Sequence, residues 1–200
     1  MNILFLYGNE KALKLADWLT EQGHIVICKK DRVDTALIFE KSIEFIVSYT
    51  YRLRIQSEIV KAVNGNAVNL HISYLPWNKG ADPNIWSWID DTPKGVSIHF
   101  VSDQIDEGDI IAQREVKLSA EDDTLSSSYD KLMDHIIFLF QEIFEYYDRW
   151  NEIAYPQVGV GTTHFSSELL KIKANIDYHI PICSFIEEIK ISVRAKNSII

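Results

Sequence analysis

The sequence predicts an α/β protein with a Rossmann-like, open and mainly parallel sheet that carries flanking helices. Two observations lead to this fold class. Short apolar runs, typical of strands covered on both faces, alternate along the chain with segments of helical periodicity. Parallel strands need crossover connections, usually helices, and successive units of this kind build an open sheet.

The N-terminal segment contains the first strand, helix and strand of this pattern. Residues 3–7 form a continuous apolar run, which Gly8 ends. Small and apolar residues then recur at helical spacing up to Gly23, a residue that suits the end of a helix. Residues 25–27 supply the next strand. We therefore expect a parallel strand pair at the N-terminus.

The pattern repeats before residue 72. Residues 45–49 are apolar and predict a third strand, and a helix follows that ends near Gly65. Residues 67–71 then predict a fourth, buried strand. Because the connections contain helices, these strands should extend the same parallel sheet.

The second half of the chain is less regular. Residues 96–101 alternate as a strand does, residues 109–118 offer another extended run, and residues 124–150 keep the spacing of one long helix. Beyond Pro156 the pattern breaks up. We therefore expect a catalytic domain over residues 1–155 and a short C-terminal appendage over residues 156–200.

Composition narrows the function classes. The chain has 20 basic and 29 acidic residues and a net charge of −9, which disfavours a general affinity for nucleic acid. Its two cysteines, Cys28 and Cys183, indicate neither a disulfide framework nor a cysteine-rich metal site. No signal peptide or membrane-spanning run is evident, so we expect a soluble, cytoplasmic protein without a membrane partner.

Polar residues at the end of the fourth strand predict a catalytic site. Period-two alternation turns Asn69 and His71 to one face, and Asp106 follows 35 residues after His71 in a loop between predicted strands. Such a strand end borders the crevice where open α/β sheets bind ligands. An imidazole can move protons, an amide can donate to a developing oxyanion, and a carboxylate can hold the imidazole.

These residues resemble the folate-dependent formyltransferases. The family signature Asn-x-His-x-Ser-x-Leu-Pro is complete from Asn69 to Pro76, and its Asp-x-x-Asp-x-Gly segment is present from Asp103 to Gly108. The resemblance covers roughly residues 1–118. It implies the formyltransferase fold, 10-formyltetrahydrofolate as formyl donor, and Asn69, His71 and Asp106 as catalytic residues. Spacing alone does not choose among the acidic residues of this loop, and the family register selects Asp106.

Two further segments are similar to sugar-nucleotide N-formyltransferases. One is residues 77–88, and the other is residues 48–52, in which Thr50 replaces the usual Gly. Aromatic faces and cationic side chains there suit a base or pterin ring and a pyrophosphate. Alternatively, Trp86 and Trp88 belong to a helix that packs inward. The binding residues that this resemblance implies are Ser48, Tyr49, Arg52, Lys79, Gly80, Asn84 and Trp86.

We therefore expect an N-formyltransferase that acts on a nucleotide-linked amino-deoxysugar, similar to dTDP-4-amino-4,6-dideoxyglucose. The product would serve surface polysaccharide biosynthesis, such as the O-antigen of lipopolysaccharide, and the enzyme would be a homodimer that needs no metal. The alternatives are a methionyl-tRNA or glycinamide ribonucleotide formyltransferase and a catalytically idle folate- or sugar-nucleotide-binding module. Two local questions stay open: the acidic loop around Asp106 could hold a hard cation, and His99 could be functional or structural.

Overall fold

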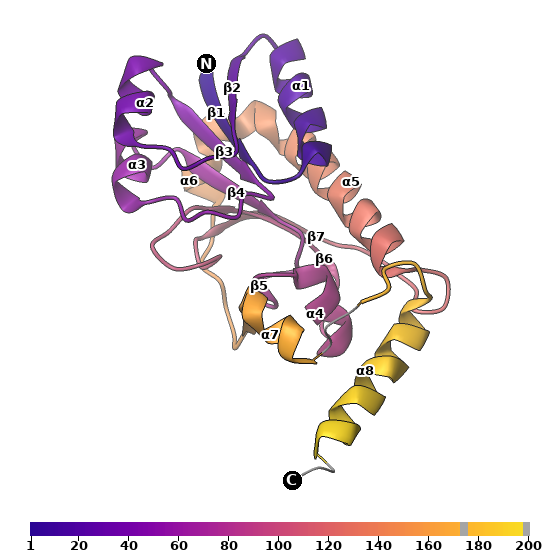
Figure 1. Cartoon of the computed structure of the whole chain (residues 1–200). Coiled ribbons are helices and arrows are strands. Elements are labelled where there is room, and N and C mark those ends of the chain that lie inside the picture. The colour runs from indigo at the N-terminus through magenta and orange to yellow at the C-terminus, as the bar shows by residue number, and fades with distance from the viewer. Residues whose placement is uncertain (173–175, 198–200) are drawn as a thin grey trace. The chain divides into compact units, whose positions relative to one another are not determined.

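The main sheet has six strands, in the order β2-β1-β3-β4-β6-β7 (Figure 1). A computed structural model describes residues 1–172 and 176–197 of the protein. The first four strands pair in parallel, and β6 runs antiparallel to β4. The prediction of an open, mainly parallel sheet is confirmed. The strands of this sheet are β1 (Asn2–Tyr7), β2 (Ile25–Lys29), β3 (Phe45–Tyr49), β4 (Ala67–His71), β6 (Gly95–Phe100) and β7 (Ile110–Glu115).

Helices connect the parallel strands, as the sequence predicts. Two very short strands, β5 (Lys79–Gly80) and β8 (Thr163–His164), form a separate parallel pair. The α-helices are α1 (Leu13–Glu21), α2 (Thr35–Glu40), α3 (Ser57–Ala62), α4 (Pro83–Ile89), α5 (Leu125–Ile143), α6 (Trp150–Ile153), α7 (Ser166–Ile172) and α8 (Ile182–Asn197), and the 3₁₀ helices are η1 (Glu10–Ala12) and η2 (Phe144–Arg149).

The chain divides into two compact units, each assembled from three segments. The first unit contains residues 1–71, 97–112 and 139–157, and the second contains residues 72–96, 113–138 and 158–200. The chain passes from the first unit to the second for the last time after residue 157, two residues beyond the boundary predicted after residue 155. The assignment of residues 1–155 as a catalytic domain and residues 156–200 as an appendage stays a prediction.

In the first unit, both faces of the sheet are covered. Leu4, Leu6 and Ile46 point to one face, where they pack with residues of α2 and α3 in one apolar cluster. Phe45 points to the other face and makes edge-on contacts with the rings of Phe144 and Trp150. Burial on both faces explains why these strands are continuous apolar runs rather than alternating ones.

The second unit has a core of its own. Residues of α4, the start of α5, α7 and α8 form one cluster of buried side chains. Its members are Ile85, Trp86, Trp88, Leu125, Leu169, Ile182, Phe185 and Ile189.

The helix predicted over residues 124–150 is shorter than expected. α5 ends at Ile143, and Tyr146 has non-helical dihedral angles of φ −105° and ψ 19°. Trp150 is buried, and its Nε1 donates to the carbonyl oxygen of Ile143 at 3.1 Å. That carbonyl belongs to the last turn of α5, where oxygens lack helical partners. The indole bond therefore stabilises the break, which hydrophobic spacing alone does not reveal.

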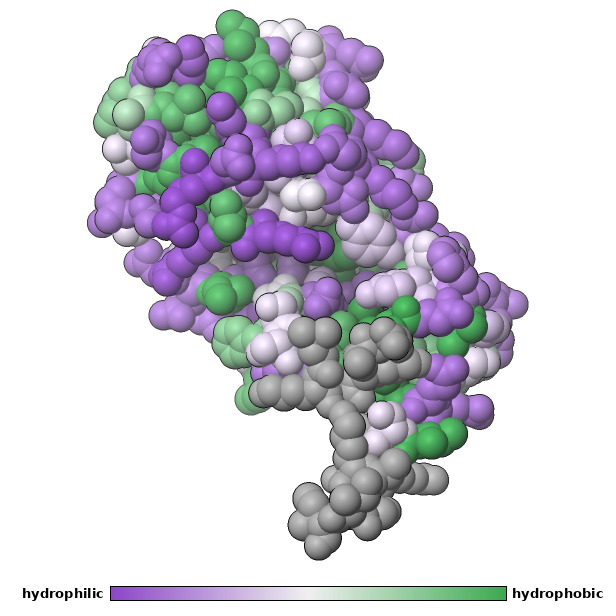
Figure 2. All heavy atoms as spheres, in the orientation of Figure 1, coloured by the Kyte–Doolittle hydropathy of each residue, from purple (hydrophilic) through white to green (hydrophobic). Residues whose placement is uncertain are grey.

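The surface is mixed in character. Figure 2 shows one face, on which hydrophobic residues gather in the region of α2 while hydrophilic residues cover much of the rest. Phe39 of α2 is 70% exposed. Among the helices of residues 1–172 and 176–197, none combines the length and hydropathy that crossing a bilayer demands.

Candidate active site

β4 and β6 place the predicted catalytic residues within the first unit. The two strands are antiparallel neighbours, with Asn69 opposite His99 and His71 opposite Ser97. On the other side of β4, Asn69 pairs with Ser48 of β3. Asn69 and His71 are two residues apart, so their side chains leave the sheet on the same face. The strand end thus carries a cluster of polar side chains.

The loop after β6 is held in a conformation that presents Asp106. Asp106 adopts a left-handed backbone with φ 53°, which Asp tolerates better than most residues. A Cβ added at Gly108 would lie 1.8 Å from the carbonyl oxygen of Phe100, so only glycine fits there. The Nε2 of Gln157 donates to the carbonyl oxygens of Asp106 at 2.7 Å and of Gly108 at 3.0 Å. These contacts fix where the carboxylate lies.

The structure brings the three predicted catalytic residues together. The Nδ2 of Asn69 donates to Oδ1 of Asp106 at 3.0 Å, and Nδ1 of His71 lies 3.6 Å from Oδ2 of the same carboxylate. The side chains of His71 and Asp106 are only 8% and 12% exposed. A carboxylate at this position can orient the imidazole and stabilise its charged form.

His99 belongs to the same cluster, and these contacts alone do not separate a functional from a structural role. It is 2% exposed, and its Nε2 lies 3.2 Å from Nδ2 of Asn69 and 3.4 Å from Oδ1 of Asp106. Its Nδ1 lies 2.8 Å from the carbonyl oxygen of Phe100. The rings of His71 and His99 meet edge to face, with centroids 6.4 Å apart. His99 therefore contacts both the amide and the carboxylate of the site.

The hydrogen-bond partners of Asn69 differ from those expected of an amide that donates to a developing oxyanion. Its Nδ2 donates to Asp106 and also lies 3.2 Å from Nε2 of His99, which accepts if the hydrogen of that ring is on Nδ1. Its Oδ1 makes no hydrogen bond within the part of the chain that the structure describes. The residue is partly exposed. The atom left for a ligand is thus an acceptor oxygen.

Three predicted binding residues lie after or within β3 in the first unit. Ser48 and Tyr49 are buried in the strand, whereas Arg52 is exposed in the loop that follows. Between them, Thr50 has φ 59°, a left-handed conformation that glycine adopts without strain. Its hydroxyl accepts hydrogen bonds from the backbone N–H groups of Gly8 at 3.1 Å and of the next residue at 2.9 Å. These bonds account for how Thr replaces the family's usual Gly.

Two further predicted binding residues, Lys79 and Gly80, form β5 in the second unit. Gly80 has φ 86°, and a Cβ there would lie 2.3 Å from the carbonyl oxygen of His164, its partner on β8. Glycine at this position is therefore required by the backbone. The binding roles of Lys79 and Gly80 stay predictions.

Asn84 and Trp86 have internal partners in the second unit. Asn84 is buried, donates to the carbonyl oxygen of Leu125 at 3.0 Å and accepts from the Ser128 hydroxyl at 3.0 Å. The indole of Trp86 is buried and stacks on the His164 ring, with centroids 3.9 Å apart and planes 4° apart. These contacts support the alternative of an inward-packed helix. Ligand-binding roles for the two residues stay predictions.

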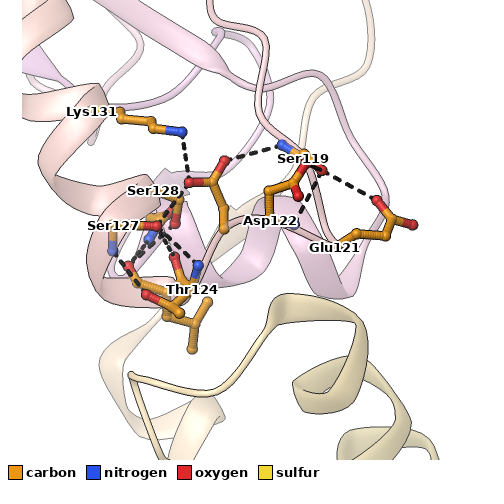
Figure 3. Close-up of polar contacts among 10 residues, drawn as sticks. Ser119, Glu121, Asp122, Thr124, Ser127, Ser128 and Lys131 are labelled. Carbon is orange, nitrogen blue, oxygen red and sulfur yellow. Dashed lines mark hydrogen bonds and ion pairs between the residues drawn. The ribbon is translucent and has the colours of Figure 1, made fainter.

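A second buried carboxylate, Asp123, lies before α5 in the second unit, and Figure 3 labels three of its neighbours, Ser119, Ser127 and Lys131. Its oxygens accept from the Lys131 ammonium at 2.8 Å, the Ser127 hydroxyl at 2.8 Å and the Ser119 backbone N–H at 3.1 Å. Thr124 and Ser127 also exchange side-chain to backbone bonds, the reciprocal arrangement that satisfies the first turn of a helix. Asp123 is thus part of a helix cap.

Metal ligation was an alternative for the acidic loop. Among residues 1–172 and 176–197, no group of three or more His, Cys, Asp or Glu side chains is arranged to hold a metal ion. The expectation of metal-independent chemistry stays a prediction.

Known proteins are similar to this chain in both fold and sequence. The chain superposes with a TM-score of 0.81 and 37% identity on the formyltransferase PseJ from Anoxybacillus kamchatkensis, solved in complex with UDP-4,6-dideoxy-4-formamido-L-AltNAc and tetrahydrofolate. That match covers 93% of this chain and 98% of PseJ.

Curated relatives match over shorter stretches. The dTDP-4-amino-4,6-dideoxyglucose formyltransferase of Mycobacterium bovis is 36% identical over 91 residues, which are 46% of this chain and 38% of that protein. The methionyl-tRNA formyltransferase of Fusobacterium nucleatum is 37% identical over 92 residues, 46% of this chain and 29% of that protein. Both matches cover well under half of the relative. The family model for formyl transferase matches residues 22–139, and with the full-length likeness to PseJ this shows that the chain belongs to the formyl transferase family.

Proposed function

We propose that this protein is a sugar N-formyltransferase, which moves a formyl group from 10-formyltetrahydrofolate to the amino group of a nucleotide-linked amino-deoxysugar. The observation that carries this proposal is the Asn69, His71 and Asp106 cluster, together with the likeness to PseJ over nearly the whole chain. PseJ was solved with a formamido sugar nucleotide and tetrahydrofolate.

Formyl transfer sets three chemical demands. The attacking amine must be deprotonated, the negative charge that develops on the formyl oxygen must be stabilised, and the departing nitrogen must receive a proton. His71 can move these protons and can donate to the oxygen when it is charged. Asp106, 3.6 Å from the imidazole, supports the charged form. Asn69 contacts Asp106 and leaves its Oδ1 for a substrate.

The substrate we favour is a 4-amino-4,6-dideoxyhexose linked to a nucleoside diphosphate. PseJ was solved with a UDP-linked 4-formamido-4,6-dideoxy sugar, and the mycobacterial relative is named for a dTDP-linked 4-amino-4,6-dideoxy sugar. The match to PseJ, over 93% of this chain, favours UDP, whereas the name of the mycobacterial relative favours dTDP, so both nucleotides must be tested. A product of this class would enter surface polysaccharide biosynthesis, including O-antigen.

Cationic side chains are proposed to meet the diphosphate. Arg52 is exposed after β3, and Lys79 lies in β5. Lys79→Ala or Arg52→Ala should raise KM for the nucleotide sugar more than KM for the folate, since a phosphate contact is lost. Lys14→Ala on the exposed face of α1 is the matched control, and it should change neither value.

We also propose a homodimer built by the C-terminal appendage. Large apolar side chains are exposed in that segment, and the most exposed are Val158 at 80% and Val160 at 89%. Phe165 and Ile191 are also more than half exposed. Replacing Val158 and Val160 by Ser should shift the measured mass in solution from dimer to monomer if these side chains form the contact.

A methionyl-tRNA substrate is the second candidate, because the Fusobacterium relative has that name. The net charge of −9 counts against it, since RNA rewards clustered basic residues. The same experiment tests the other two alternatives, which are glycinamide ribonucleotide as the substrate and a binding module without catalytic activity.

The test is a side-by-side rate comparison with 10-formyltetrahydrofolate, in which mass spectrometry detects the formylated product. The acceptors are UDP- and dTDP-linked 4-amino-4,6-dideoxyhexoses, the free amino sugar, glycinamide ribonucleotide and charged initiator tRNA. We expect turnover of a nucleotide sugar and far slower turnover of the free sugar, because the remote diphosphate and base position the amine. Preference for glycinamide ribonucleotide or tRNA would refute the sugar substrate, and no turnover at all would favour the idle module.

A further inference from the structure

We propose that His99 is a positioning residue: its Nε2 accepts a hydrogen bond from Asn69 and so turns the Asn69 Oδ1 toward the substrate amine. This inference rests on the proposed formyl transfer and assigns which atom of Asn69 meets the reacting groups. It differs from the expectation that the amide donates to the formyl oxygen.

The argument begins at the Nδ1 atom of His99, which lies 2.8 Å from the carbonyl oxygen of Phe100. A carbonyl oxygen only accepts hydrogen bonds, so Nδ1 must carry a hydrogen. In a neutral imidazole the other nitrogen then has a lone pair and accepts. The backbone carbonyl of Phe100 thus selects the tautomer of His99.

The tautomer in turn selects the orientation of the Asn69 amide. The amide nitrogen lies 3.2 Å from Nε2 of His99 and 3.0 Å from Oδ1 of Asp106. Both of these neighbours are acceptors when Asp106 is ionised and His99 is neutral. Only the NH₂ group can satisfy both, and it has one hydrogen for each.

The opposite orientation of the Asn69 side-chain amide is less stable. If the amide turned by half a rotation, its Oδ1 would face the carboxylate oxygen of Asp106 and the lone pair of His99. His99 is 2% exposed, so water could not easily relieve these contacts. A buried acceptor without a donor costs about 1–3 kcal/mol in proteins. The network therefore holds Oδ1 outward.

An outward oxygen suits a hydrogen-bond donor. The attacking amine of the sugar carries N–H groups, whereas the nitrogen that bears the formyl group in the donor has no hydrogen before transfer. Oδ1 of Asn69 would accept from the amine and direct its lone pair at the formyl carbon. Donation to the formyl oxygen is then left to His71.

Matched variants separate positioning from simple packing. In His99→Asn, the side-chain amide can still donate to the Phe100 carbonyl, but it is too short to accept from Asn69. In His99→Gln, the longer side chain can place an oxygen where Nε2 was. We expect His99→Asn to lower kcat at least about tenfold, the rate equivalent of one hydrogen bond, with KM for both substrates little changed. His99→Gln should recover much of the lost rate.

A measurement that does not depend on turnover tests directly which nitrogen of His99 carries the hydrogen. Long-range ¹H–¹⁵N correlation spectra of the wild-type protein at neutral pH should show His99 neutral, with its hydrogen on Nδ1. Hydrogen on Nε2, or on both nitrogens, would overturn the proposal. Equal kcat losses in the two variants, or wild-type kcat in His99→Asn, would also overturn it. If the wild-type protein transfers no formyl group, the proposed function fails, and the spectra still decide the tautomer of His99.

Discussion

Asp106 in the first unit and Asp123 in the second are two carboxylates with little solvent exposure, and they have different neighbours. Asp106 is 12% exposed and lies beside two imidazoles and an amide. Asp123 is 2% exposed and lies beside an ammonium, a hydroxyl and a backbone N–H. Imidazoles change their protonation near neutral pH, whereas the partners of Asp123 are donors at any pH near neutrality. The neighbours, rather than burial, therefore distinguish the proposed catalytic carboxylate from the capping one.

The largest expected effect is on turnover at the first carboxylate. His71→Ala or Asp106→Asn should lower kcat about a hundredfold or more, because proton transfer by a positioned group contributes at least that much. The free energy of unfolding should change by less than about 1 kcal/mol, since neither side chain is part of the apolar core. Steady-state kinetics and urea unfolding measure the two quantities. Wild-type turnover by His71→Ala would contradict the proposed mechanism.

For Asp123 we expect the opposite pattern, in which substitution lowers stability but not turnover. Asp123→Asn removes a charged acceptor from Lys131 and Ser127, so the free energy of unfolding should fall by about 2 kcal/mol while kcat stays close to wild type. Asp122→Asn is the matched control, since Asp122 is exposed and bonds only the Ser119 hydroxyl among the contacts in Figure 3. If Asp123→Asn lost kcat but not stability, the proposed difference in role between Asp106 and Asp123 would be wrong.

The pH dependence of that stability follows from the pKa of Asp123. Burial by itself raises this pKa, but the hydrogen bonds from Lys131, the Ser119 backbone and Ser127 outweigh it, and the pKa lies below its usual value. A lowered folded-state pKa stabilises the folded protein above the ordinary value and loses that effect as pH falls through the folded one. The difference in stability between wild type and Asp123→Asn should therefore shrink in acid.

A smaller effect is expected from the side chains that support each carboxylate. Gln157→Met keeps the length of the side chain but removes its two bonds to the Asp106 loop, so kcat should fall by about threefold to tenfold. Ser127→Ala, which removes a hydroxyl from Asp123, should lower the melting temperature and leave kcat unchanged. Equal effects of both variants on kcat would show that the polar networks are not separate in function.

The sequence predicts the strands and the catalytic register because both depend on local pattern. Strands buried on both faces are apolar runs, and the motif spacing selects Asp106. α2 is missing from the predicted elements, since its six residues include a single buried one, Ile38. Short helices of this kind carry almost no periodic signal.

Other features depend on tertiary contacts that no local pattern encodes. The stacking of Trp86 on His164, 78 positions later in the chain, is one such contact. The tautomer of His99 follows from a backbone carbonyl, and Gln157 reaches the Asp106 loop from far along the chain. The sequence therefore predicts candidate catalytic residues, but not the contacts that orient them.

The last prediction concerns metal and should show no effect. A divalent cation at the first carboxylate would make Asp106 a ligand and cancel the contrast with Asp123. Asn69 donates to Asp106 through a nitrogen, which is a poor neighbour for a cation at the same oxygen. Exhaustive chelation should therefore leave kcat unchanged, with elemental analysis confirming that the treated protein is metal-free. A rate that falls on chelation and returns only with added Mg²⁺ or Ca²⁺ would instead place a cation in the acidic loop from Asp103 to Asp109.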